Sequence, residues 1–232
     1  MANKKTKLVQ TIKKVLLYTC LFFVVGTSCL VLLLGLIPIN SSSFMLQQHL
    51  TDFYDDKGFI SIKQDWVSKE DISPYMFSAV VASEDQLFYQ HHGFDIDSIL
   101  SVLKNKSSGK KIRGASTISQ QVAKNLFLTP SRSIWRKGLE AWFTILMELF
   151  WSKDRIVLVY VNIAQFGDHL FGVEAASQHY FSVPAKSITP EQAALLAASL
   201  PNPILFKVDR PSNYMISKQQ WILRQMKNLS FL

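Results

Sequence analysis

The hydrophobic pattern of the chain begins with an unbroken apolar run from Val15 to Ile37, which contains no charged side chain. As an α-helix this run is about 34 Å long, which is enough to cross the hydrocarbon core of a bilayer. A cleaved signal peptide is the main alternative, but its apolar region usually spans about 7–15 residues and ends at small residues. Residues 38–40 form a poor cleavage site. The pattern therefore favours an uncleaved transmembrane anchor over residues 15–37.

After a polar stretch, apolar positions recur at helical spacing through the rest of the chain. We interpret residues 38–64 as a connector, with one candidate strand at Phe59–Ile62, and residues 65–232 as a single domain. A capping box with proline at the first helical position, Thr189–Gln192, marks one helix start. No alternation of strands and helices is visible, so the fold class is mainly α. Helices are expected near residues 74–90, 95–106, 116–127, 131–151, 153–165, 171–181, 190–200 and 213–229.

One of these helices is apolar nearly all round, over Leu139–Trp151. It is too short to span a bilayer. We interpret it as a central buried helix, in preference to a surface that dips into a membrane.

Charge changes the picture at the amino-terminal end. Of the net charge of +8, five lysines lie before residue 15, whereas the remainder carries 20 basic and 17 acidic residues. Lysines beside a span stay in the cytoplasm. We therefore expect residues 1–14 to form a cytoplasmic tail and the domain to lie on the outer side of the membrane. The small excess elsewhere argues against a nucleic-acid partner. Cys20 and Cys29 both lie in the apolar run, which excludes a Cys-based metal site.

The first candidate for chemistry is Glu84-Asp85, near the end of an apolar helix pattern. A carboxylate that follows small and apolar residues is expected to be half-buried, which suits a general base or acid near neutral pH. An exposed acidic pair in a last helical turn is the alternative.

Polar side chains also gather at helical spacing in the segment that begins at Ser116. Ser116, Gln120 and Lys124 share one face, with Thr117 and Gln121 beside them. Hydroxyls and amides that end in a cation make a plausible groove for sugar hydroxyls and one anionic group. A solvated helix face is an equally good explanation of this segment alone.

A third segment places cations on one helix face. Arg132, Arg136 and Glu140 follow each other at intervals of four residues, and Lys137 is three residues before Glu140. Arginine can grip phosphate with two hydrogen bonds, so this face is a candidate clamp for an oxyanion. Glu140 would hold the cations in place or bind a divalent ion, Mg²⁺ or Mn²⁺. Ordinary salt bridges on a surface helix explain Glu140 but not the excess positive charge.

These residues fall in ordered motifs that resemble the peptidoglycan glycosyltransferases, and the similarity covers roughly residues 65–228. Two departures from the family pattern stand out: Leu158 replaces an acidic residue, and Lys218 offers the only cation where two arginines are usual. No G-x-S-x-G sequence is present, we expect no transpeptidase domain, and the monofunctional branch is the closest match. The motifs are Glu84-Asp85-x-x-Phe88-x-x-His91-x-Gly93, Gly114–Asn125, Arg136-Lys137-x-x-Glu140 and Lys153–Gly167.

The resemblance implies a lysozyme-like helical domain that polymerises lipid II, a disaccharide-pentapeptide on undecaprenyl diphosphate, into β-1,4-linked glycan. It implies Glu84 as the base and Glu140 as a second catalytic residue. Lipid II and the nascent glycan strand would be the partners, with cell-wall synthesis or division proteins as further candidates. A membrane-anchored lytic transglycosylase or muramidase is the alternative. The substrate-binding residues implied are Asp85, Phe88, Ser116, Thr117, Gln120, Gln121, Lys124, Asn125, Arg132, Arg136 and Lys137.

Overall fold

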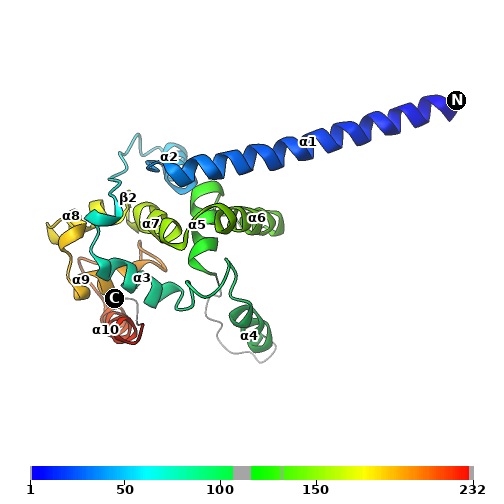
Figure 1. Cartoon of the computed structure of the whole chain (residues 1–232). Helices are drawn as coiled ribbons and strands as arrows, with labels where there is room; N and C mark the ends of the chain where they lie inside the picture. Colours follow the sequence, from blue (N-terminus) through cyan, green and yellow to red (C-terminus); the bar gives the residue numbers. More distant parts are fainter. Residues whose placement is uncertain (1, 107–115, 132, 230–232) are drawn as a thin grey trace. The chain divides into compact units, whose positions relative to one another are not determined.

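The computed structural model describes residues 2–106, 116–131 and 133–229 of the chain (Figure 1). The chain divides into two compact units, Met1–Ile37 and Pro38–Leu232. The first unit is one long helix, α1 (Ala2–Leu36), in which Lys7–Leu36 is long and apolar enough to cross a membrane. This helix agrees with the single anchor that the apolar run predicts.

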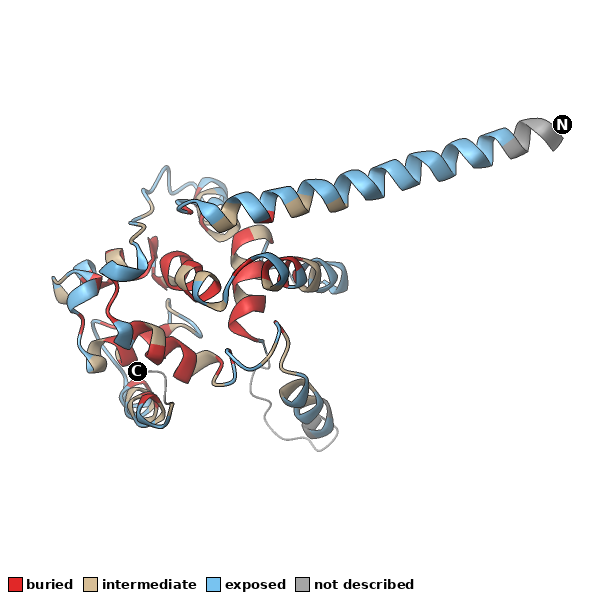
Figure 2. Cartoon of the chain, in the orientation of Figure 1, coloured by how far each residue is buried: buried red, intermediate tan, exposed pale blue. Residues whose placement is uncertain are grey.

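The second unit is built almost entirely of helices, which confirms the mainly α fold class. Two groups of helices form its core. α3 (Pro74–Glu84) packs on α9 (Pro190–Ser199) and α10 (Asn213–Asn228), and α5 (Ile118–Phe127) packs on α6 (Ile134–Phe150) and α7 (Lys153–Ile163). Figure 2 shows much of α3 and α5 in red, the colour of buried residues. The remaining α-helices described in this unit are α2 (Ser43–Tyr54), α4 (Ile96–Lys106) and α8 (Val173–Phe181).

One small antiparallel sheet lies between α7 and α8, formed by β1 (Gln165–Gly167) and β2 (Leu170–Phe171). Lys63 forms an isolated parallel bridge to Leu170 of this hairpin. The strand expected at Phe59–Ile62 is therefore wrong, because only this one residue, just beyond it, pairs with a strand.

The polar segment that follows the anchor contains a helix that the sequence did not predict, α2 (Ser43–Tyr54). Its first turn is capped by Ser42, whose Oγ accepts the backbone N–H of Met45 at 3.3 Å. Asp52 of α2 is buried and lies 2.6 Å from Nε2 of His169 in the β1–β2 turn. Residues 38–64, which we interpreted as a connector, are thus part of the second compact unit.

The helices start where their caps predict but some end earlier than expected. The capping box at Thr189 is present, with Pro190 in the first turn of α9. α3, expected to reach residue 90, ends at Glu84. The next residue, Asp85, adopts an extended φ of −160° because its side chain is bonded elsewhere.

The apolar helix within Leu139–Trp151 is only partly the buried helix that we expected. Phe143, Leu146 and Met147 of α6 are buried, but Ile145 and Leu149 are exposed. One face of α6 is therefore buried and the other is exposed, although both faces carry apolar side chains.

Candidate active site

Glu84 is the last residue of α3, and its carboxylate is held by hydrogen bonds from two elements. Oε2 accepts a hydrogen bond from Nε2 of Gln121 in α5 at 3.0 Å, and Oε1 accepts one from Oγ of Ser83 at 3.1 Å. The side chain is half-buried. A carboxylate with a fixed orientation and remaining access to a cleft is suited to receive a proton from a bound hydroxyl.

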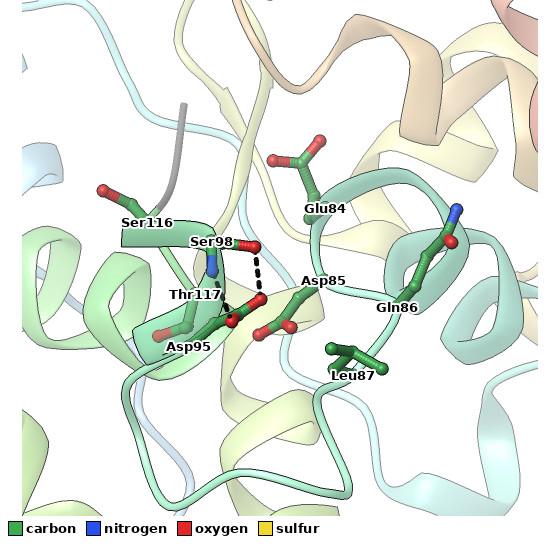
Figure 3. Close-up of a pocket in the computed structure, with 8 residues that line it drawn as sticks. All are labelled: Glu84, Asp85, Gln86, Leu87, Asp95, Ser98, Ser116 and Thr117. Atoms are coloured by element: carbon green, nitrogen blue, oxygen red, sulfur yellow. Dashed lines mark hydrogen bonds between the residues drawn. The ribbon is translucent and has the colours of Figure 1, made fainter. Parts of the chain in front are cut away.

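The neighbouring Asp85 is buried and points away from Glu84, as Figure 3 shows. Its Oδ2 accepts the backbone N–H of Ile118 at 3.0 Å, and both of its oxygens lie 3.0 Å from Nε2 of His91. Asp85 therefore satisfies one of the free N–H groups in the first turn of α5, where negative charge is also favoured. The substrate-binding role predicted for Asp85 stays a prediction.

Two hollows meet at Glu84. The smaller one, of about 250 Å³, extends towards the start of α4 (Figure 3), and the larger one, of about 490 Å³, extends towards α10. Since one carboxylate opens onto both, a group bound in either hollow can approach the same oxygen atoms. The smaller hollow is lined by Glu84, Asp85, Gln86, Leu87, Asp95, Ser98, Ser116 and Thr117. The larger one is lined by Ala82, Ser83, Glu84, Asp85, Gln86, Ser116, Gln121, Pro201, Tyr214, Lys218 and Trp221.

The polar residues at the start of α5 divide into two groups. Thr117 and Gln120 are buried and form a capping box, and the Thr117 hydroxyl also donates to the carbonyl of Gly93 at 2.7 Å. Ser116 is exposed and borders both hollows, while Gln121 borders the larger one. The polar groove predicted from this segment thus has Ser116 and Gln121 at its surface, whereas Gln120 serves the helix itself.

The cations form a cluster on α5 and α6. Glu140 is buried, and its two oxygens are bonded by Nη1 of Arg136 at 2.8 Å and by Nζ of Lys137. Burial lowers the pKa of the Lys124 ammonium, the carboxylates of Glu140 and Glu84 oppose this shift, and the charges of Arg136 and Lys137 add to it. Of these charges that of Glu84 has the smallest effect on Lys124, and none of the three cations lines either hollow at Glu84.

Three further predicted site residues have different surroundings. Phe88 is fully buried, with its ring edge-to-face with Tyr89 and Nζ of Lys153 4.6 Å from the ring centroid, so it packs beneath the site. Asn125 is half-buried, and its Oδ1 has no hydrogen-bond partner within the described parts of the chain. Arg132 lies outside the described residues, as do Gly114 and Ala115 of the second motif.

The surroundings of Glu140 fit a resident metal ion poorly. Among the residues that the structure describes, no group of three or more His, Cys, Asp or Glu side chains could hold a metal. Both Glu140 oxygens already accept hydrogen bonds from cations. Positive side chains on both oxygens oppose the approach of a divalent cation.

Sequence reasoning missed several residues that border the site. Tyr214 and Trp221 of α10 line the larger hollow, and Asp95 and Ser98 line the smaller one. Tyr160 of α7 donates a hydrogen bond to Gln121 at 3.0 Å. The resemblance included Tyr160 in its fourth motif, but no local pattern indicates a contact between residues 39 positions apart.

The helical fold, with a cleft centred on one glutamate carboxylate, is that of enzymes with a lysozyme-like domain. A family model described as "Transglycosylase" matches residues 53–227. Proteins called biosynthetic peptidoglycan transglycosylase are similar over most of their length. The one from Mannheimia succiniciproducens is 50% identical over 90% of this chain and 85% of its own. The one from Haemophilus influenzae is 51% identical over the same shares, and the one from Pasteurella multocida is 50% identical over 94% and 88%.

The chain therefore belongs to the transglycosylase family. A match over most of the second unit, together with relatives of about half-identical sequence, confirms the family inferred from the motifs.

Proposed function

We propose that this chain is a peptidoglycan glycosyltransferase that polymerises lipid II into β-1,4-linked glycan strands. The observation that carries the proposal is the position of Glu84, whose half-buried carboxylate is held by Gln121 and Ser83 and opens onto two hollows. Relatives named biosynthetic peptidoglycan transglycosylases support the substrate class.

In the proposed reaction Glu84 is the general base. The carboxylate accepts the proton of the acceptor sugar's 4-hydroxyl, and the oxygen forms a bond to the anomeric carbon of the growing chain. The bond from that carbon to the diphosphate breaks, and undecaprenyl diphosphate leaves with the electron pair. Attack from the face opposite the leaving group inverts an α-linked donor to a β-linked product.

The leaving diphosphate carries its own negative charge, so the reaction needs cations rather than an acid. Lys124, Arg136 and Lys137 provide positive charge along α5 and α6, and we assign the diphosphate to them. Glu140 is placed to hold Arg136 and Lys137 in position. In this arrangement Glu140 contributes to catalysis by positioning the two cations. The resemblance implies a catalytic role for Glu140, and we propose that this positioning is that role.

A lytic transglycosylase or muramidase is not favoured. Such an enzyme must protonate the glycosidic oxygen and has no diphosphate to bind. The three cations on α5 and α6 would then have no substrate group to neutralise, and the relatives carry names of biosynthetic enzymes.

We propose a divalent cation only as an ion that the substrate diphosphate would bring to the site. Mg²⁺ or Mn²⁺ would have to be held mainly by substrate oxygens, because both Glu140 oxygens are bonded to cations. EDTA added to a polymerisation assay tests this. Loss of polymer that Mg²⁺ restores would show that the reaction needs a divalent cation. An unchanged amount of polymer would show that it does not.

We further propose that α1 anchors the enzyme in the inner membrane, with the lysine-rich end in the cytoplasm and the second unit in the periplasm. Both substrates are lipid-linked, so an anchor in the same membrane raises their effective concentration. Protease digestion of spheroplasts tests the orientation, since only a periplasmic domain would be cleaved. Cell-wall synthesis or division proteins as partners stay a prediction.

The main experiment uses the purified full chain with labelled lipid II in detergent. Long polymer is expected from the wild type. Glu84→Gln, which keeps the shape but cannot accept the proton, should lower the rate by about 100-fold or more. Activity of Glu84→Gln within tenfold of wild type would contradict the assignment of the base.

A further inference from the structure

Behind Glu84, two hydrogen bonds connect it to a buried tyrosine. The hydroxyl of Tyr160 in α7 donates to Oε1 of Gln121 in α5 at 3.0 Å, and Nε2 of Gln121 donates to Oε2 of Glu84 at 3.0 Å. Three residues from three helices thus form one chain that ends on the carboxylate.

The direction of this chain follows from the chemistry of its buried end. Tyr160 is buried, and this burial together with the negative charge of Glu84 raises the pKa of its phenol well above the ordinary value. The phenol therefore keeps its proton and can donate it. An amide has one acceptor end and one donor end, so the Gln121 carbonyl faces Tyr160 and its NH₂ group faces Glu84.

The reverse orientation of the Gln121 amide would be unfavourable at both ends. Its carbonyl oxygen would face the Glu84 carboxylate, so that two acceptors would meet, and its NH₂ group would face the phenol as a second donor. Buried polar groups that are left without partners destabilise the folded protein. Tyr160 thus selects the orientation in which Gln121 can donate to the carboxylate.

The other oxygen of Glu84 has a different kind of neighbour. Oγ of Ser83 lies 3.1 Å from Oε1 of Glu84 and 3.3 Å from the carbonyl oxygen of Ala197. A hydroxyl has a single proton and can donate to only one of these acceptors at a time. When the Ser83 proton turns to Ala197, Oε1 keeps free lone pairs, whereas Oε2 remains bonded to Gln121. Oε1 then has more free lone-pair capacity than Oε2 for an incoming proton.

We propose that Tyr160 is a positioning residue for the reaction, which acts through Gln121 to hold the Glu84 carboxylate with Oε1 towards the acceptor hydroxyl. This inference rests on the proposed role of Glu84 as the base. It also changes the role of Gln121, predicted from the sequence to bind substrate, to a link between Tyr160 and the base. Tyr160 is buried and makes its effect without touching the substrate.

The experiment is a double-mutant cycle on the full chain, with Tyr160→Phe, Gln121→Ala and the combined variant, assayed with labelled lipid II. Tyr160→Phe keeps the buried ring and removes only the hydroxyl. Its kcat should fall about tenfold, as expected for one hydrogen bond that orients a charged group, while KM for lipid II should change less than about twofold. In the Gln121→Ala background, Tyr160→Phe should have no further effect on kcat, because Tyr160 then has nothing to orient.

A pH profile separates positioning from simple structural damage. Loss of a hydrogen-bond donor to a carboxylate favours its protonated form, so the acidic limb of kcat should move to higher pH in Tyr160→Phe and in Gln121→Ala. Tyr180→Phe is the matched control, because it removes a hydroxyl that donates to the backbone carbonyl of Phe166 at 3.0 Å, away from Glu84. It should leave both kcat and the acidic limb unchanged.

The outcomes are distinguishable. A kcat of Tyr160→Phe within twofold of wild type, or losses that multiply in the double variant, would overturn the positioning role while the base remains supported by Glu84→Gln. If Glu84→Gln keeps wild-type activity, the base assignment and the role of Tyr160 both fail. Thermal unfolding of each variant, measured alongside, shows that the compared proteins are folded at the assay temperature.

Discussion

The Asp85 carboxylate accepts the backbone N–H of Ile118 at 3.0 Å and so ties the residue after Glu84 to the first turn of α5. α5 also carries Gln121, which bonds Glu84 itself. The two acidic neighbours thus contact the same helix, one through its backbone and one through a side chain. Asp85 fixes the start of the helix whose later turn orients the base.

Replacement of Asp85 should therefore lower both stability and activity. Asp85→Ala leaves the N–H of Ile118 and the ring of His91 without their acceptor in a buried place, and we expect a loss of about 1–3 kcal/mol in the free energy of unfolding. Asp85→Asn keeps one acceptor oxygen and should lose less. Denaturant unfolding measures the stability and polymerisation measures kcat. Equal stability of Asp85→Ala and wild type would contradict this role.

Variants of Arg136 and Glu140 can separate the contribution of the Arg136 charge to stability from its contribution to donor binding. Arg136→Ala leaves the buried Glu140 carboxylate short of a partner, so the free energy of unfolding should fall by about 3 kcal/mol. Adding Glu140→Ala removes the uncompensated charge and should restore part of that stability. Donor binding should stay weak in the double variant, because the positive charge of Arg136 is still absent. Recovery of donor binding together with stability would refute the clamp.

Lys124 should give the enzyme an alkaline limit below that of an ordinary lysine. Burial lowers the pKa of the ammonium, so as the pH rises the charge is lost before the usual value of about 10.4. Activity that needs this charge is present below the lowered pKa and falls above it. Lys124→Arg keeps its charge to higher pH and should move the alkaline limb of the pH–rate profile upward. An unchanged limb would show that another group sets it.

Gly93 should tolerate no side chain. Its φ of +87° lies in the left-handed region, and a Cβ there would approach Cγ2 of Thr144 to 2.8 Å and Cγ of Glu148 to 3.0 Å. Gly93→Ala is expected to lower the free energy of unfolding by about 1–3 kcal/mol. Gly138→Ala is a suitable control, since a Cβ at that position in α6 meets no atom within 4 Å. A loss in Gly93→Ala no larger than in this control would contradict the steric explanation.

Local signals predicted much of the fold. The anchor follows from a long apolar run, and the start of α9 follows from the capping box at Thr189. α2 was missed because residues 40–43 read as a turn-rich link, and because contacts such as that of Asp52 with His169 join residues 117 positions apart. The early end of α3 was missed for the same reason, since Asp85 leaves the helix to bond Ile118, 33 positions away.

Local sequence patterns likewise predicted only part of the candidate site. Spacing along a helix predicted the contacts of Arg136 and Lys137 with Glu140, because residues three and four apart share a face. It also placed Gln120 on a ligand-binding face, where the capping box shows that its side chain serves the helix instead. Tyr160 could not be identified, because a buried tyrosine in an apolar helix looks like core until its partner is known.

The two hollows that share Glu84, Asp85, Gln86 and Ser116 have a consequence for inhibition. A small molecule seated in either hollow would crowd the same carboxylate, even if it left the opposite hollow empty. Compounds of unrelated shape could then block turnover from two directions, and two such compounds that both reach Glu84 would exclude each other. Chemically dissimilar inhibitors are thus expected to compete, because both hollows end at the side chain of Glu84.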